Sequence, residues 1–389
     1  MILSIIDSSV GERERNQEGD SVGTEPLVVL APDKFKGSLS AAEAVAALAR
    51  GLRRAVPGVR LVEHPIADGG EGTVDMVLAH GFAPVAVEVR GPTGEPVTAR
   101  YALRGDTAVV EMAAAAGLGL LPSGPDDDTA RTATTYGVGE LLRDALDRGA
   151  RRIVLGIGGS ATTDGGRGMA EALGVRLDLT GLDLAGLDPR VAQTEIVVAC
   201  DVDNPLTGPS GAAAVYGPQK GAGPETVALL DRELGRWADL VAAATGRDLR
   251  ELPGAGAAGG LGFGAAALLG AEVRSGVELL LELSGFPEAV AGADLVIVGE
   301  GSLDEQSLRG KGPLGAAALA ARGGTTVVAV AGRCTVDPDR LRAHGVDAVY
   351  PLTDLEPDPA RSMARAPELL ETTAERIAAD RLRAPERTP

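Results

Sequence analysis

The sequence predicts an α/β fold in which a second domain is inserted into a discontinuous Rossmann-like domain. Segments typical of strands and helices alternate near both ends of the chain, which indicates parallel sheet with crossover helices. A block of short alternating segments between them predicts antiparallel or mixed strands, and 389 residues are too many for one ordinary core. We therefore expect a disordered tail over 1–25, a Rossmann-like parallel-sheet domain from 26–66 plus 286–385, an inserted α/β domain over 67–285, and a site in the cleft between these domains.

The first part of the chain predicts one strand–helix–strand unit. Leu27–Pro32 has the apolar character of a buried strand, and an alanine-rich amphipathic helix follows it. Ser40, with Glu43 three residues later, is a capping-box pattern for the start of that helix. A second strand, Arg60–His64, leads through a glycine-rich loop into a helix over 74–79.

The pattern changes in the next block. Segments 85–89, 97–101 and 107–111 alternate between apolar and polar residues and are separated by Gly-Pro and Gly-Asp turns, which predicts an antiparallel meander. The acidic stretch 122–131 reads as a loop. An amphipathic helix then leads to an apolar strand over 152–155.

The remainder of the chain returns to alternating strands and helices. A polar helix carries the only tryptophan and is expected to be structural, while a glycine run opens a further helix. The expected strands are 195–199, 293–298, 325–330 and 348–350, the tryptophan-bearing helix is 226–244, the glycine run is 254–262, and the C-terminal helix is 359–381.

Composition and charge exclude several classes of function. The formal net charge of −18 argues against nucleic acid and anionic membranes as partners. No apolar run reaches the roughly 18 residues that a membrane helix needs. Two cysteines far apart in the chain predict neither a disulfide framework nor a zinc site, and a reducing cytoplasm fits this composition. The sequence defines no oligomeric state, and a homodimer is kept as an open alternative.

A glycine-rich corner over 156–166 is the strongest local signal for an anionic ligand. It follows a strand and precedes a helix-like segment at 169–173. Glycines at such a corner let backbone N–H groups approach a ligand closely, and the N-terminus of a helix adds partial positive charge. Hydroxyls and one acid lie among these glycines, which favours a phosphate site over a turn that merely requires glycine.

The lysines are few and occur in similar surroundings. Only four of the 37 basic residues are lysine: Lys34, Lys36, Lys220 and Lys311. Each lies in a glycine-rich or loop-like segment rather than on a charged helix face. Because lysine is a compact point charge on a flexible stem, it suits neutralisation of a phosphate in a narrow pocket.

Acidic residues follow two of the predicted strands, and each pair has more than one possible role. Asp201 and Asp203 flank a valine at a strand end, which suits a hard cation or a hydroxyl to be deprotonated. Asp203 also precedes Asn204-Pro205, so an Asx-turn is a competing interpretation. Asp68 and Glu71 could hold a metal, bind a substrate hydroxyl or cap a helix.

Familiar nucleotide motifs do not decide the class. The sequence has no GxxxxGK[ST], no HRD with DFG and no HExxH. The segment 156–161 fits GxGxxA, and Asp178 lies near the expected ribose-binding position, so a dinucleotide-dependent oxidoreductase is a rival hypothesis. Against it, the helix should start at the third small residue, yet the chain continues through Thr-Thr-Asp-Gly-Gly. A non-catalytic module that binds a sugar phosphate or an acid is a third alternative.

Seven collinear motifs resemble those of the bacterial glycerate kinase family. They are APDKFKGSLSA (31–41), ADGGEGT (67–73), GIGGSATTDGG (156–166), CDVDNPLTGP (200–209), YGPQKGA (216–222), GAAGGLG (256–262) and GEGSLDEQ with GKGP (299–306 and 310–313). The resemblance implies a Rossmann-like domain with an inserted second α/β domain. It also implies transfer of the γ-phosphoryl group of ATP to D-glycerate with Mg²⁺ as the metal cofactor. The family favours 2-phosphoglycerate as product; 3-phosphoglycerate, or a related small hydroxy acid as substrate, is the alternative.

Roles for individual residues follow from the demands of phosphoryl transfer, which needs positioning and charge neutralisation more than covalent chemistry. Asp201 is expected to be the base or the residue that orients the hydroxyl, with Lys36 and Lys311 as catalytic cations. Asp203 and Asp304 are expected near Mg²⁺. The residues expected to bind substrate or phosphate are Lys34, Ser38, Asp68, Gly69, Gly70, Glu71, Gly158, Gly159, Ser160, Thr162, Asp164, Asn204, Lys220, Gly259 and Gly260.

Overall fold

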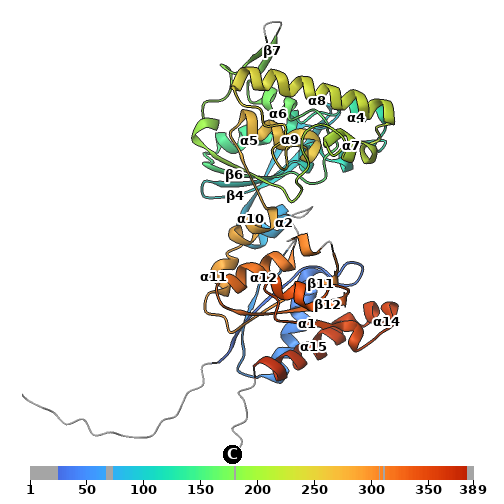
Figure 1. Cartoon of the computed structure of the whole chain (residues 1–389). Helices are drawn as coiled ribbons and strands as arrows, with labels where there is room; N and C mark the ends of the chain where they lie inside the picture. The colour runs from blue at the N-terminus through green and yellow to red at the C-terminus, as the bar shows by residue number, and fades with distance from the viewer. Residues whose placement is uncertain (1–24, 67–72, 179–180, 306, 310–311, 383–389) are drawn as a thin grey trace, which may run out of the picture.

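Two β-sheets, each covered by helices, organise the chain in a computed structural model (Figure 1). The structure describes residues 25–66, 73–178, 181–305, 307–309 and 312–382. The α/β fold class predicted from the sequence is confirmed, with one parallel and one mixed sheet. None of the helices in these described ranges combines the length and apolar character needed to span a bilayer.

The first sheet is entirely parallel and joins segments from both ends of the chain. Its strand order is β13-β12-β11-β1-β2. Helices α1 and α15 pack on one face, and α11, α12 and α13 pack on the other. The elements are β1 (Leu27–Pro32), α1 (Ala41–Ala55), β2 (Arg60–Glu63), α11 (Phe286–Val290), β11 (Leu295–Leu303), α12 (Pro313–Arg322), β12 (Thr326–Cys334), α13 (Pro338–Ala343), β13 (Ala348–Pro351), α14 (Pro359–Ala364) and α15 (Ala366–Arg381).

The second sheet is mixed, in the order β10-β9-β6-β5-β4-β3. Strands β3, β4 and β5 form the predicted antiparallel meander, and β5, β6, β9 and β10 run parallel. The strands are β3 (Ala83–Arg90), β4 (Pro96–Arg104), β5 (Thr107–Glu111), β6 (Arg152–Gly156), β9 (Glu195–Ala199) and β10 (Glu272–Arg274), and a small hairpin adds β7 (Arg176–Asp178) and β8 (Gly181–Asp183).

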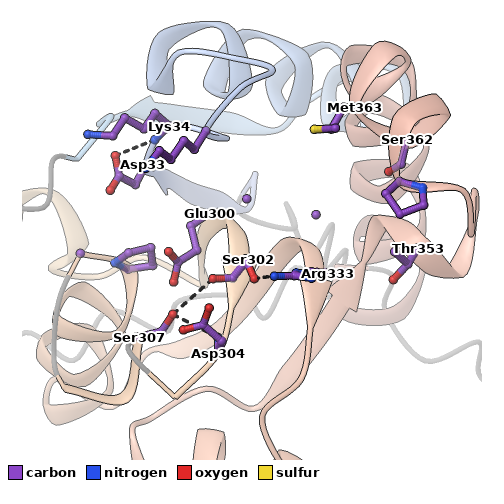
Figure 2. A pocket seen from close by; sticks show the side chains of 16 residues that line it. Asp33, Lys34, Glu300, Ser302, Asp304, Ser307, Arg333, Thr353, Ser362 and Met363 are labelled. Carbon is purple, nitrogen blue, oxygen red and sulfur yellow. Dashed lines mark hydrogen bonds between the residues drawn. The ribbon is translucent and has the colours of Figure 1, made fainter.

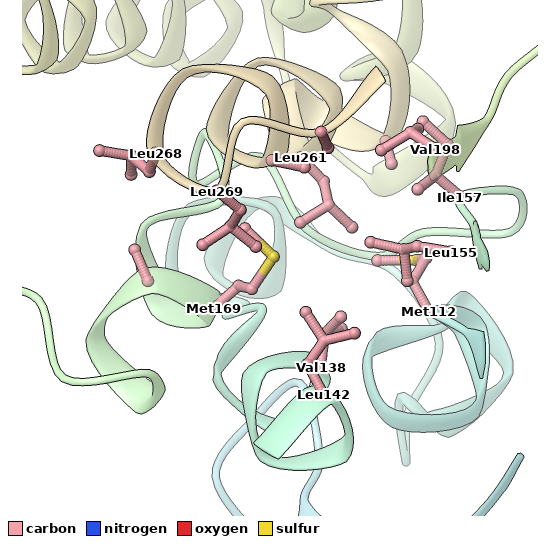
Figure 3. Close-up of a cluster of buried hydrophobic side chains, with 14 of the residues drawn as sticks. Met112, Val138, Leu142, Leu155, Ile157, Met169, Val198, Leu261, Leu268 and Leu269 are labelled. Atoms are coloured by element: carbon pink, nitrogen blue, oxygen red, sulfur yellow. The ribbon is translucent and has the colours of Figure 1, made fainter. Parts of the chain in front are cut away.

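Most helices of this part cover one face of the second sheet, where they enclose its larger core. In Figure 3, Met112, Val138, Leu155, Met169 and Leu261 converge from strand ends and helices into this core. The covering helices are α3 (Ala113–Ala116), α4 (Asp127–Thr132), α5 (Tyr136–Asp147), α6 (Arg167–Ala172), α7 (Ala212–Tyr216), α8 (Pro224–Thr245) and α9 (Ala257–Leu268).

Two helices lie on the opposite face of the second sheet, between it and the first sheet (Figure 1). They are α2 (Thr73–Ala79) and α10 (Gly276–Leu283). Leu279 and Leu283 of α10 pack against the second sheet, whereas Val277 and Leu281 join the core of the first. One short helix therefore buries its side chains against both sheets.

Local sequence signals explain several helix starts and two wrong boundaries. Ser40 and Glu43 form the predicted capping box of α1. The stretch predicted as an acidic loop instead contains α4, because Asp126 and Thr129 form a second capping box there. The single predicted C-terminal helix is in fact two helices, α14 and α15. Pro367 lies in the first turn of α15, where the missing N–H of a proline costs no hydrogen bond within the helix.

Candidate active site

A large cavity in the described part of the chain opens at the carboxyl ends of β1, β11 and β12. Its volume is about 590 Å³, within the range of small-molecule sites. Asp33 and Lys34 lie on one side of it and Glu300 and Asp304 on the other in Figure 2. The lining residues are Asp33, Lys34, Lys36, Glu300, Gly301, Ser302, Asp304, Ser307, Gly312, Pro313, Gly332, Arg333, Thr353, Pro359, Ser362 and Met363.

This place in the first sheet is a topological switch point. From β1 the chain crosses through α1 to β2 on one side, and from β11 it crosses through α12 to β12 on the other. The two helices cover opposite faces, so the loops after β1 and β11 diverge and leave a crevice. Open α/β sheets bind ligands at such crevices.

The loop after β1 presents its lysines by anchoring the residue between them. Phe35 is 3% exposed in the core beneath α1, and its backbone pairs with Leu39 in a tight turn. Lys34 and Lys36 are exposed and line the cavity. Ser38 does not line it: its hydroxyl donates to the Met363 carbonyl oxygen at 2.7 Å. The structure thus places Ser38 in a contact between this loop and α14.

The far wall of the cavity is an extension of β11 beyond its predicted end. Residues 299–303, predicted as loop, continue the strand and pair with β12. A Cβ atom on Gly332 would lie 2.4 Å from the Gly301 carbonyl oxygen, so this part of the floor tolerates no side chain. Asp304 follows directly, and its backbone N–H donates to the Ser307 hydroxyl at 3.2 Å.

The glycine corner lies at the carboxyl edge of the second sheet. Gly158 and Gly159 are exposed, and Gly159 has a φ of +73°, which favours glycine. Ser160 and Thr162 are buried, and the chain here pairs with residues 116–118. Within the first half of the corner, the exposed residues are therefore Gly158 and Gly159.

Lys220 lies beneath the corner rather than at a surface. It is 1% exposed, and its ammonium donates to the Thr162 carbonyl oxygen at 2.6 Å. Burial lowers the pKa of Lys220 to about 7, an effect that the nearby Asp164 carboxylate opposes. The structure shows Lys220 as a support of the corner backbone, not at a surface where a substrate carboxylate would reach it.

Asp164 is likewise engaged within the corner. Its carboxylate accepts hydrogen bonds from the backbone N–H and hydroxyl of Thr135, both at 2.8 Å, and from the backbone of Gly166 and Gly168, both at 3.1 Å. Removal from water raises the pKa of Asp164 above its ordinary value, although these bonds favour the charged form. The side chain fixes the turn into α6.

The second glycine run packs against the first. Gly259 and Gly260 have φ values of +66° and +91°. A Cβ atom on Gly259 would lie 1.9 Å from the Thr162 carbonyl oxygen, and one on Gly260 would lie 2.8 Å from Gly165 Cα. These glycines permit close backbone contact between the run and the corner.

Asp201 lies at the carboxyl end of β9, beside the start of α10. Its Oδ1 accepts from the Ser275 hydroxyl at 3.1 Å and from the Gly276 N–H at 3.0 Å. Asp203 is exposed and does not line the large cavity. Asn204 donates to the Ser210 carbonyl and accepts from the Tyr216 hydroxyl, so its amide is used within the fold.

Five predicted site residues lie outside the described residues. They are Asp68, Gly69, Gly70, Glu71 and Lys311.

Comparisons with known proteins identify the family. The glycerate kinase family model matches residues 28–382. The chain belongs to the glycerate kinase family. It is 44% identical over 371 residues to a glycerate kinase of Halalkalibacterium halodurans, covering 90% of this chain and 97% of that protein. It is 43% identical over 342 residues to the glycerate 2-kinase of Escherichia coli, covering 83% and 89%.

A solved structure supports the same relationship. A crystal structure provisionally described as glycerate kinase 2 from Salmonella typhimurium LT2 is 41% identical to this chain, with a TM-score of 0.78. The similarity covers 92% of this chain and 98% of that one.

The rival dinucleotide-binding hypothesis fails on the geometry of the corner. Helix α6 begins only at Arg167, after Thr162-Thr163-Asp164 and two left-handed glycines, and not at the third small residue. The N–H groups of its first turn therefore lie well past the GxGxxA segment.

Several residues that line the large cavity were not among the site residues predicted from the sequence. Glu300 and Ser302 were contained in a recognised motif, but Arg333, the second-last residue of β12, was not. Arg333 donates from Nε to the Ser302 hydroxyl at 3.0 Å (Figure 2). Its position near the end of a predicted strand could have identified it, because in a parallel sheet the carboxyl ends of all strands meet at one edge.

Proposed function

We propose that this glycerate kinase family member transfers the γ-phosphoryl group of ATP to D-glycerate, giving 2-phosphoglycerate and ADP. The observation that carries the proposal is the large cavity at the switch point of the first sheet, lined by two exposed lysines and by Asp304, in a chain matched by the family model over 28–382. ADP formation that depends on D-glycerate, followed in a coupled assay, tests it. Purified protein without such turnover would refute it.

ATP is assigned to the large cavity, with Lys34 and Lys36 beside its phosphates. The volume of about 590 Å³ suits a nucleotide better than the three-carbon acid. Lysine ammonium groups stabilise the charge that spreads over the phosphoryl oxygens during transfer. Glycerate is assigned to the carboxyl edge of the second sheet, at the exposed residues Gly158 and Gly159.

Asp201 is assigned as the base. The glycerate hydroxyl oxygen attacks the γ-phosphorus, the bond from that phosphorus to the β,γ-bridging oxygen breaks, and the hydroxyl proton passes to the carboxylate. The bonds from Ser275 and Gly276 reach only Oδ1 of Asp201 and orient the carboxylate. Oδ2 is the oxygen proposed to accept the proton.

The acidic residues fit Mg²⁺ that arrives with the nucleotide. Among the residues described, no three acidic or histidine side chains cluster as a preformed metal site. Mg²⁺ commonly binds through one or two carboxylates plus substrate phosphates, where it neutralises charge on the transferring group. Asp304 lines the cavity and is the proposed carboxylate, whereas Asp203 lies outside it. Loss of turnover in EDTA, restored by excess Mg²⁺, tests the metal requirement.

The product site is proposed from a relative named glycerate 2-kinase. A ³¹P NMR spectrum of the product distinguishes 2-phosphoglycerate from 3-phosphoglycerate by its coupling to one or two carbon-bound protons. A cytoplasmic location and a homodimer stay predictions, and sedimentation of the purified chain tests the latter.

A further inference from the structure

A second cavity lies behind the glycine corner, away from the nucleotide cavity. Its volume is about 350 Å³, at the lower end of the range for small-molecule sites. Thr163, Asp164 and Arg167 form one wall, and residues of α8 form another. The lining residues are Arg131, Thr163, Asp164, Arg167, Leu177, Leu230, Glu233, Leu234, Arg236, Trp237 and Leu240.

Three arginines from three helices surround this cavity. Arg131 comes from α4, Arg167 from α6 and Arg236 from α8. Arg167 pairs with Glu171 at 2.7 Å. Within the described ranges, Arg131 and Arg236 form no salt bridge of 4.0 Å or less. Such a convergence of cations is notable in a chain with a net charge of −18.

The acidic lining, Asp164 and Glu233, offsets two of the three positive charges and leaves the lining with one net positive charge. Asp164 already accepts four hydrogen bonds from Thr135, Gly166 and Gly168. Only Glu233 adds an exposed carboxylate. Thr163 is 6% exposed, and its hydroxyl has no hydrogen-bond partner among the residues that the structure describes. A buried polar atom of this kind is costly unless it is satisfied.

We propose that this cavity binds a small phosphate monoester. Guanidinium groups match phosphate oxygens bidentately, and a phosphate monoester carries close to two negative charges at neutral pH. Trp237 and the leucines supply an apolar wall for a short carbon skeleton. The cavity is smaller than the one assigned to ATP, which favours a small metabolite over a nucleotide.

The bound anion acts on the glycine corner over 156–166, a consequence that rests on the proposed function. Trp237 donates from Nε1 to the Gly165 carbonyl oxygen at 3.0 Å. Gly165 belongs to the same corner as Gly158 and Gly159, the residues assigned to glycerate. Contact of the phosphate with Arg167, and of the carbon skeleton with Trp237, therefore changes kcat at saturating ATP and glycerate.

Trp237 also provides the test, because it is the only tryptophan of the chain and lines the cavity. Its fluorescence is titrated with glycerol 3-phosphate at constant ionic strength, with glycerol as the uncharged control. We expect a saturable change with glycerol 3-phosphate only. Arg131→Gln/Arg236→Gln weakens this binding at least tenfold, since two charge-assisted contacts are lost. Arg232→Gln, which removes an exposed arginine of α8 outside the cavity, changes it less than twofold.

The outcomes separate the new site from the proposed catalysis. An equal fluorescence response in the double variant, or an equal response to glycerol, overturns the site. The double variant keeps basal kcat within twofold but loses the effect of glycerol 3-phosphate on kcat. Binding without any effect on kcat overturns only the proposed link between the cavity and the glycine corner, and not the site itself. Absence of glycerate-dependent turnover overturns the proposed function and leaves the fluorescence titration interpretable.

Discussion

Replacement of the buried lysine beneath the corner, Lys220→Met, should change how stability depends on pH. Burial lowers the pKa of Lys220 to about 7, against an ordinary value of 10.5. Between these values the unfolded chain binds the proton that the folded chain has released, so the wild-type protein gains stability as pH rises. The gain approaches about 1.4 kcal/mol per pH unit, and amounts to about 2.5 kcal/mol between pH 7.5 and 9.5.

Lys220→Met keeps the aliphatic stem but removes the titrating group. The free energy of unfolding of wild type minus that of the variant should therefore rise by about 2.5 kcal/mol over this pH range. Urea unfolding followed by Trp237 fluorescence reports on the part of the chain that contains both residues. Lys36→Met, the same change at an exposed lysine, is the matched control and should give no such rise. A wild-type-minus-variant difference that stays constant within about 0.5 kcal/mol would refute the reasoning.

Other substitutions test the assigned roles. Asp201→Asn should lower kcat by roughly 10²–10⁴ if the carboxylate is the base, while a drop of only a few fold in folded protein removes that role. Gly259→Ala should lower the free energy of unfolding by about 1–3 kcal/mol more than Gly270→Ala. Both glycines have positive φ, but only at Gly259 would the added carbon meet a backbone oxygen, 1.9 Å away; equal losses would contradict this. Lys34→Gln should raise the KM for ATP about tenfold, because a charge-assisted contact with phosphate is lost, and an unchanged KM would move the nucleotide elsewhere.

The order of elements was predictable because hydrophobic periodicity is local. The β-rich meander and the flanking strand–helix units each carry their own pattern, so the fold class followed from the sequence. One boundary that failed, the end of β11, depended on a contact between segments far apart in the sequence. Residues 299–303 look like a loop because they are rich in glycine and polar residues, yet β12 pairs with them and extends the strand.

Site residues were harder to predict than elements because glycine and polar residues serve two purposes. The run at 254–262 resembled another ligand loop, but Gly259 and Gly260 face the corner backbone. Ser38 shared a motif with Lys34 and Lys36, yet its hydroxyl turns to Met363. The sequence predicts which residues lie in loops at the edge of a sheet. It does not say whether such a residue faces a ligand or another part of the chain.

The scarcity of lysine takes on a more specific meaning in the structure. Lys34 and Lys36 are exposed at a cavity, where a flexible point charge suits phosphate. Lys220 is a lysine for a different reason: at 1% exposure, a cation must either be paired or be able to release its proton. Arginine stays charged in proteins, whereas lysine becomes neutral and still donates to the Thr162 carbonyl oxygen. The same residue type is thus favoured at an exposed phosphate site and at a buried support, and only burial tells the two apart.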